Sequence, residues 1–106
     1  MAYKISLITG DGIGPELSES AVSVLNAIDA KFDLKFEITK LSAGDKALEE
    51  TGNALPQNVV DTIKNSDVCL KAPVGESAAD VIVVLRRILD LYANIRPAKS
   101  YPHMPA

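Results

Sequence analysis

The chain has 106 residues, of which 47% are hydrophobic and 24% are charged, a balance typical of a soluble globular domain. The net charge of −3 argues against a nucleic-acid or membrane-surface partner, because such partners are usually met by basic surfaces. The N-terminal apolar run is too short for a signal peptide or a membrane span, and the single cysteine excludes an internal disulfide, so we expect a cytoplasmic protein.

The first half of the chain alternates between strand-like and helix-like patterns. Residues 3–9 (YKISLIT) predict a buried strand, and Pro15 is well placed to begin a helix over residues 15–30. The apolar stripe of this helix is expected at Leu17, Ala21, Leu25 and Ile28. Residues 36–41 predict a second strand, and residues 44–50 predict a short helix that ends at Thr51-Gly52-Asn53.

The second half repeats this alternation. Pro56 is expected to begin a helix with Val59, Val60 and Ile63 as its apolar stripe, and residues 67–71 predict a third strand. A helix is predicted over residues 78–92, capped by Ser77, with an inner face formed by Val81, Ile82, Leu85, Ile88 and Leu89. Residues 92–100 are expected to be extended. This alternation indicates parallel βαβ units with right-handed crossovers, and the proline-rich tail SYPHMPA suggests that a longer chain continues.

Two glycine-containing loops follow predicted strands. GDGIGPE (residues 10–16) enters the first helix, but Pro15 and the negative charge of Glu16 disagree with an ordinary dinucleotide or phosphate loop. LKAPVGES (residues 70–77) enters the last helix. Each stretch is also compatible with a plain strand-to-helix turn, whereas two such loops at one sheet edge could wall a ligand cleft.

Two arginines stand out on the apolar segment LRRILDLYANIR. Guanidinium groups at Arg86 and Arg96, on adjoining elements, could hold a dicarboxylate, although solvated surface arginines are the ordinary interpretation. Arg87 is expected to be exposed. The lone histidine, His103, is expected to be a surface residue, and Cys69 a small core residue. No metal-ligand spacing and no nucleophile–base pair is evident, so no metal site or catalytic residue is predicted.

Taken together, GDGIGPE, AGDKAL…TG…LP, LKAPVGES and LRRILDLYANIRPAKS resemble the N-terminal part of the β-decarboxylating dehydrogenases, over residues 4–102. This family includes isopropylmalate, isocitrate and homoisocitrate dehydrogenases, and GESAADVIV before LR looks most like its archaeal-type isopropylmalate members. The resemblance implies a three-layer αβα fold that is not a Rossmann fold. Residues 1–106 would form the N-terminal part of the large, cofactor-binding domain, with the remainder of the enzyme absent.

The resemblance also implies a reaction and a set of contacts. The family oxidises a malate-type 2-hydroxy acid with NAD or NADP, aided by Mg²⁺ or Mn²⁺, and then releases CO₂. Arg86 and Arg96 match the substrate-carboxylate arginines, and the cofactor's nicotinamide end is expected near Ile13 and near Pro73, Val74 and Gly75. The catalytic tyrosine and lysine and the metal aspartates of the family fall outside these residues, so the 106 residues alone are expected to be inactive. A homodimer is expected for the whole enzyme.

Substrate choice in the family depends on the helix turn before Arg86. Isocitrate enzymes typically have Ser and Asn at the positions occupied here by Asp80 and Ile82. Ile82 could contact an isopropyl group, which favours 3-isopropylmalate and leucine biosynthesis. Ser77 could still supply a hydroxyl to the substrate, so isocitrate and homoisocitrate remain open, as does a non-catalytic anion-binding module.

Overall fold

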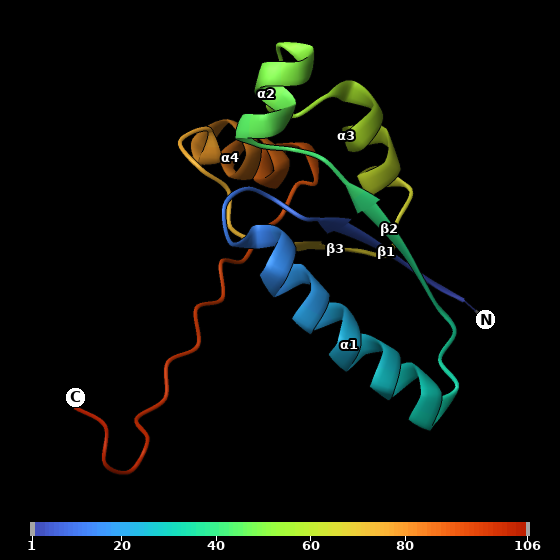
Figure 1. Cartoon of the computed structure of the whole chain (residues 1–106), viewed down its shortest axis with the longest axis vertical. Coiled ribbons are helices and arrows are strands. Elements are labelled where there is room, and N and C mark those ends of the chain that lie inside the picture. Colours follow the sequence, from blue (N-terminus) through green and yellow to red (C-terminus); the bar gives the residue numbers. More distant parts are fainter. Residues whose placement is uncertain (1, 106) are drawn as a thin grey trace.

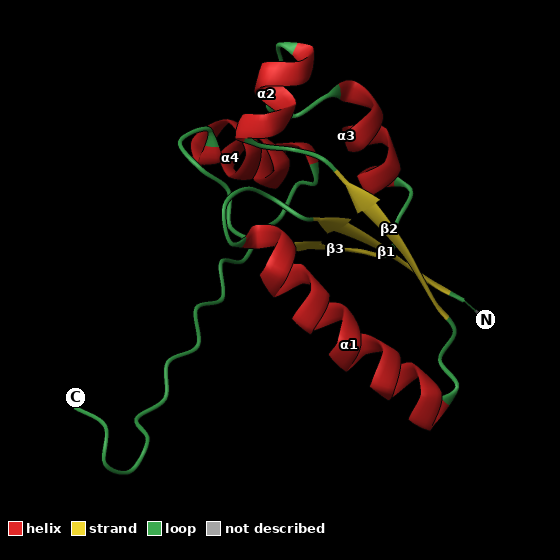
Figure 2. Cartoon of the chain, viewed as in Figure 1, coloured by secondary structure: helices red, strands yellow, loops and turns green. Residues whose placement is uncertain are grey.

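The computed structural model describes residues 2–105 and contains a three-stranded parallel sheet with helices on both faces (Figures 1 and 2). Strands and helices alternate as the sequence predicts, and most boundaries agree within two residues. The elements, in chain order, are β1 (Tyr3–Ile8), α1 (Gly14–Phe32), β2 (Phe36–Leu41), α2 (Asp45–Thr51), α3 (Gln57–Lys64), β3 (Val68–Lys71) and α4 (Ala78–Ile88).

β1 is the middle strand of the sheet, in the order β2-β1-β3. It pairs in parallel with β2, where Tyr3 lies opposite Phe36, and with β3, where Ile5 lies opposite Val68. Its last four residues are buried because neighbouring strands and helices enclose them on every side. Ser6 is fully buried, and its hydroxyl is hydrogen-bonded to the hydroxyl of Ser66. β1 therefore contributes buried side chains to both faces of the sheet.

The main hydrophobic core lies on the face that α3 and α4 cover. α3 contributes the predicted stripe of Val59, Val60 and Ile63, while α4 contributes Val81 and Leu85. These side chains enclose Ile8 of β1, together with Ala43, Ala54 and Leu55 from the connecting segments. α1 lies on the opposite face of the sheet (Figure 2). The arrangement of helix, sheet and helix confirms the predicted three-layer class.

The apolar stripe predicted for α1 is only partly covered. Gly14 and Ser18 are its buried residues, whereas Leu17 and Ile28 are 46% and 38% exposed. The 19 residues of α1 span about 28 Å and the six residues of β1 only about 20 Å, so the C-terminal turns of the helix, where Ile28 lies, extend past the sheet. Leu17, near the start of the helix, lines an open hollow beside Leu7 and Leu70 of the sheet. The prediction of the helix is confirmed, and the prediction that the whole stripe packs inward is wrong for these residues.

α4 ends at Ile88 and not at residue 92 as the pattern predicts. Asp90 has a left-handed φ of +53°, and its N–H donates to the Arg87 carbonyl, while the N–H of Leu91 donates to the Arg86 carbonyl. These two bonds form a Schellman turn. The turn usually has glycine where Asp90 stands, so the sequence offered no signal for it. Ile88, predicted on the inner face, is 37% exposed, whereas Leu89 packs against the core as predicted.

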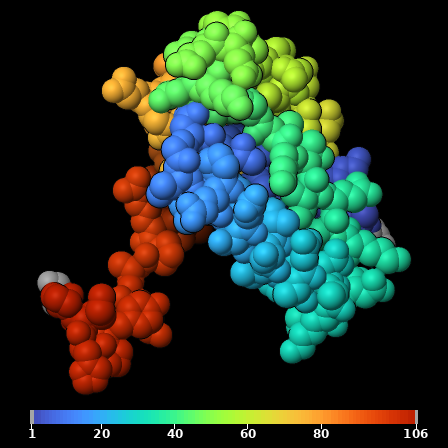
Figure 3. Space-filling view, in the orientation of Figure 1, coloured from blue at the N-terminus to red at the C-terminus, as the bar shows by residue number. Residues whose placement is uncertain are grey.

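The residues after α4 leave the body of the molecule (Figure 3). Residues 91–105 are all exposed, and residues 92–100 form neither a helix nor a strand. The predicted extended segment is therefore present only as an irregular path without strand partners. Among the helices in residues 2–105, none has the length and apolar character that crossing a bilayer requires.

Candidate functional site

The two loops singled out in the sequence lie side by side at the carboxyl end of the sheet. β1 and β3 are neighbours, so the chain leaving β1 at Gly10 meets the chain leaving β3 at Pro73. The N–H of Asp11 donates to the carbonyl of Pro73 at 2.9 Å. Gly10 has a φ of +72°, and a Cβ there would collide with the same carbonyl oxygen. The predicted proximity is confirmed, and the two loops touch directly at this point.

The four residues expected to line the cofactor differ in their exposure. Ile13, which precedes α1, is 62% exposed, and Pro73 and Gly75 are also exposed. Val74 is half-buried and packs against the hydrophobic core. Ile13, Pro73 and Gly75 are therefore available to a ligand at this edge, whereas Val74 anchors the loop to the core beneath.

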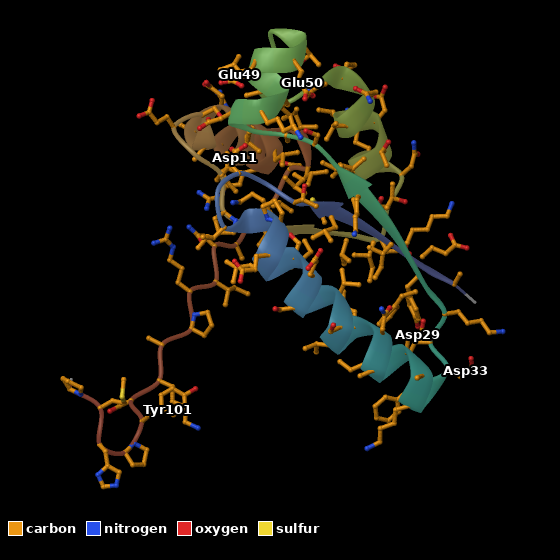
Figure 4. All side chains as sticks on the ribbon, viewed as in Figure 1. Asp11, Asp29, Asp33, Glu49, Glu50 and Tyr101 are labelled. Atoms are coloured by element: carbon orange, nitrogen blue, oxygen red, sulfur yellow. The ribbon has the colours of Figure 1, made fainter. Side chains whose placement is uncertain are left out.

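The carboxylate of Asp11 joins three segments that are far apart in the sequence. It accepts hydrogen bonds from the N–H groups of Asp45 at 2.8 Å, Lys46 at 3.2 Å and Gly75 at 3.0 Å. Partial burial acts to raise the pKa of Asp11, but these three backbone donors outweigh it and lower the pKa below its ordinary value. Figure 4 shows Asp11 beside the first turn of α2. Asp11 therefore ties the β1 loop to α2 and to the loop after β3.

The carboxylate of Asp45 makes a second set of contacts, to the start of α4. It accepts hydrogen bonds from the Ser77 hydroxyl at 2.6 Å, the Ser77 N–H at 2.9 Å and the Glu76 N–H at 3.1 Å. The hydrogen bond from the Ser77 hydroxyl is the main cause that lowers the pKa of Asp45, and the bond from the Ser77 N–H is the next. Asp45 thus accepts the N–H groups of the N-cap residue Ser77 and of Glu76 before it, which no intrahelical carbonyl can accept.

Ser77 has a different role from the ones predicted. It occupies the N-cap position of α4, but its side chain makes no capping bond of its own. Its side chain is buried, and its hydroxyl donates to Asp45. Ser77 stands at the predicted N-cap position, but the predicted side-chain capping bond is absent, because its hydroxyl donates to Asp45. The hydroxyl offered as a possible substrate contact is already engaged within the protein.

Two glycines make room for these carboxylates. A Cβ on Gly44 would collide with the carboxylate of Asp11, and a Cβ on Gly75 would collide with that of Asp45. Neither aspartate was expected as a site residue from the sequence. The only local signal was their position next to glycine, in GDG and AGDK, because their partners lie 31 to 64 residues away.

The predicted substrate residues on α4 lie at its exposed end. Arg86 is exposed in the last turn of the helix, and Ile82, one turn earlier, is half-buried. Residues four apart share a helix face, so a guanidinium group and an apolar side chain are neighbours there. Arg86 also lines a surface hollow of about 310 Å³ with the segment from Leu91 to Ile95. Arg87 is exposed, as predicted.

Arg96 is exposed in the irregular segment that follows, one residue beyond those that line the hollow. The structure therefore brings Arg86 and Ile82 together on one helix face, but it records no contact of Arg96 with either. A joint grip by the two arginines on one dicarboxylate stays a prediction.

The exposed groups at this edge suit an aromatic ring better than a phosphate or a metal ion. The N–H groups of Asp45 and Lys46 at the start of α2 are already bonded to Asp11, and the Ser77 N–H before α4 is bonded to Asp45, so a carboxylate already lies at the start of each helix. What is exposed beside them is apolar side chain and backbone at Ile13, Pro73 and Gly75. Within residues 2–105, no three His, Cys, Asp or Glu side chains are grouped as a metal site requires.

Comparison with known proteins agrees with this arrangement. Residues 4–106 match the family model of isocitrate/isopropylmalate dehydrogenase. The chain is 46% identical to a 3-isopropylmalate dehydrogenase of Saccharolobus solfataricus, over 98% of this chain and 31% of that protein. It is 50% identical to a 3-isopropylmalate dehydrogenase of Sulfurisphaera tokodaii, over 96% of this chain and 30% of that protein.

A solved structure has a similar fold. The crystal structure of isocitrate dehydrogenase from Methylococcus capsulatus superposes with a TM-score of 0.68 at 38% identity, over 85% of this chain and 26% of that one. The chain spans about 30% of the length of the curated relatives that it matches. The resemblance carried by GDGIGPE, LKAPVGES and LRRILDLYANIRPAKS is confirmed: the chain belongs to the isocitrate/isopropylmalate dehydrogenase family.

Proposed function

We propose that the protein carrying this chain is an NAD-linked 3-isopropylmalate dehydrogenase of leucine biosynthesis. It would oxidise the hydroxyl of a malate-type acid and release the β-carboxylate as CO₂. The observation that carries the substrate proposal is the pairing of Arg86 with Ile82 on one face of α4. The names of the relatives at 46% and 50% identity support the same substrate.

Each substrate residue has a proposed role. Arg86 binds a malate carboxylate through its planar guanidinium, and Arg96 binds a second carboxylate from the segment after α4. Ile82 contacts the isopropyl group, since an isoleucine side chain has no hydrogen-bond donor for a third carboxylate. Asp80, two residues before Ile82 on the same helix, is exposed and adds a negative charge to this part of α4, which disfavours the additional carboxylate of isocitrate.

The cofactor wall is proposed from three exposed residues. Ile13, Pro73 and Gly75 would pack against the nicotinamide end of NAD, with Val74 holding the loop in place, and NADP is the alternative cofactor. Bound NAD supplies the hydride acceptor. The ligands of Mg²⁺ or Mn²⁺, and the catalytic tyrosine and lysine of the family, would be supplied by residues other than those described here. We further propose that residues 1–106 are the N-terminal part of a large domain in a cytoplasmic homodimer.

The experiment is an activity assay on the complete protein with 3-isopropylmalate, isocitrate and homoisocitrate, each with NAD and with NADP. Reduction of NAD in the presence of 3-isopropylmalate and Mg²⁺ is the expected result. Turnover of isocitrate or homoisocitrate alone would replace the substrate, an alternative that the similarity to the Methylococcus enzyme keeps in view. Binding of these acids without any reduction of the dinucleotide would indicate an anion-binding module.

A matched pair of arginines tests the role of Arg86. Arg86→Lys keeps the charge but removes the two-pronged contact, and we expect kcat/KM for the acid to fall about 10- to 100-fold. Arg87→Lys, on the neighbouring exposed position, should leave kcat/KM within about twofold. Equal effects of the two substitutions would contradict the proposed carboxylate contact.

A further inference from the structure

We propose that Asp11 and Asp45 are positioning residues that set the direction of α4 and the shape of the cofactor wall. Their two carboxylates and Ser77 form a chain of contacts, here called the carboxylate relay, from the loop after β1 through α2 to the start of α4. The proposal rests on the function proposed for Arg86 and for the loop at Gly75, and it names the parts of the protein that hold these residues in place.

The relay uses both oxygens of both carboxylates. One oxygen of Asp11 accepts the N–H groups of Asp45 and Gly75, and the other accepts that of Lys46. In Asp45, one oxygen accepts the N–H and the hydroxyl of Ser77, and the other accepts the Glu76 N–H. Hydrogen bonds to an ionised acceptor are the strong ones in proteins. The relay therefore fixes each carboxylate in place and leaves neither rotating freely.

The relay holds the N-terminal end of α4, so a tilt of the helix at this end would displace Arg86 near the other end. Ser77 is the residue before the helix, and Arg86 lies nine residues further along it. At 1.5 Å per residue this is about 13 Å, so a tilt of about 10° at Ser77 would move Arg86 by about 2 Å. A displacement of about 1 Å at a reacting group can cost a hundredfold in rate. A small rotation of α4 at Ser77 would therefore become a large displacement of Arg86 relative to the substrate.

The relay also holds the cofactor wall from behind. Gly75 belongs to the exposed wall, and its N–H is bound by Asp11 while its Cα lies against the carboxylate of Asp45. The close approach leaves no room for a side chain at Gly75. Loosening either carboxylate would free the segment between Pro73 and Ser77 to move toward or away from the dinucleotide.

The test uses Asp45→Asn in the complete protein, with Asp29→Asn as a matched control. Asp29 has the same chemistry, because its carboxylate accepts the N–H groups of Lys35 at 2.8 Å and Phe36 at 3.1 Å. It lies at the opposite end of α1 from the site, as Figure 4 shows. Both substitutions place an amide N–H₂ among backbone donors, so a general loss of stability affects both.

Two measurements distinguish a failure of the relay from a failure of the proposed function. Hydrogen exchange at the Glu76 and Ser77 amides should rise at least about tenfold in Asp45→Asn and stay unchanged in Asp29→Asn. The KM for NAD should rise and kcat with 3-isopropylmalate should fall, each at least about fivefold, only in Asp45→Asn. Equal exchange in the two variants would overturn the relay. Faster exchange with unchanged kinetics would overturn its positioning role.

Ser77 supplies a finer test. Ser77→Ala removes the hydroxyl donor, whereas Ser77→Thr keeps one, so activity and slow exchange should be restored in the threonine variant. Identical behaviour of the two variants would overturn the assignment of the hydroxyl to the relay. If the wild-type protein reduces no dinucleotide, the proposed function fails while the exchange measurement still judges the relay.

Discussion

Replacing Gly10 by alanine tests how closely the two loops at the carboxyl end of the sheet approach each other. Gly10 has a φ of +72°, and a Cβ there would collide with the Pro73 carbonyl oxygen, which is backbone and cannot rotate away. Gly12, two residues later, has a φ of +58° with no atom within 4 Å of its Cβ position. The two glycines share a loop and a left-handed backbone and differ in the space around them.

The expected magnitudes follow from that difference. A left-handed backbone costs an alanine about 1–2 kcal/mol, and both variants bear this cost. Forcing an atom into a filled space typically costs a further 1–3 kcal/mol, and only Gly10→Ala bears this second cost. We therefore expect Gly10→Ala to lower the free energy of unfolding by about 2–5 kcal/mol, and Gly12→Ala by about 1–2 kcal/mol.

Urea denaturation of the two variants beside the wild type measures both free energies. For a chain of this size, the expected difference between the variants corresponds to roughly 1 M in the urea midpoint. Activity of the complete protein should fall with Gly10→Ala, because the Pro73 loop moves to admit the methyl group. Equal midpoints for Gly10→Ala and Gly12→Ala would refute the direct contact between the loops.

Three further predictions concern the core, the carboxylates and the cysteine. Val81 is fully buried, so Val81→Ala should cost about 2 kcal/mol of unfolding free energy, whereas Val83→Ala, at a 47% exposed position, should cost under about 0.5 kcal/mol in the same assay. The pKa values of Asp11 and Asp45 are lowered by folding, so their stabilisation is present above the ordinary value of 3.8 and is lost as pH falls through the lower folded-state values. Urea midpoints measured from pH 6 to pH 2.5 should therefore drop below about pH 4, and less steeply in Asp11→Asn; an unchanged slope would contradict this. Burial raises the pKa of Cys69, so iodoacetamide at pH 8 should modify the folded protein at least about tenfold more slowly than the urea-unfolded one.

The order and type of the elements could be predicted because they depend on local pattern. The period of the apolar residues distinguishes strands such as residues 36–41 from helices such as α3, and Pro15 marks the start of α1. The end of α4 could not be predicted in this way. Asp90 adopts a left-handed conformation that usually selects glycine, and the pattern of apolar residues continues past it.

The candidate site could be predicted only where a single residue carries the signal. Arg87 is exposed as its position predicts, and Arg86 is exposed at the same end of α4, so its role as a substrate contact stays a prediction. The contacts of Asp45 could not be predicted, because a carboxylate that binds the start of another helix 31 residues away has no local pattern. Ser77 has the residue type and the position of an N-cap, but only the folded structure reveals that its hydroxyl donates to Asp45.

The position of β1 in the middle of the sheet has a consequence for how the chain folds during synthesis. β1 is made before both of its partners, and Ile8 meets its β3 neighbour Lys71 only after 62 intervening residues have been added. Parallel pairing across such separations is slow to form, because a long loop must close before any strand bond is made. Until β3 emerges, the apolar side chains of β1 lack one of their two neighbouring strands. A chaperone that binds short apolar segments would have its longest opportunity at this first strand.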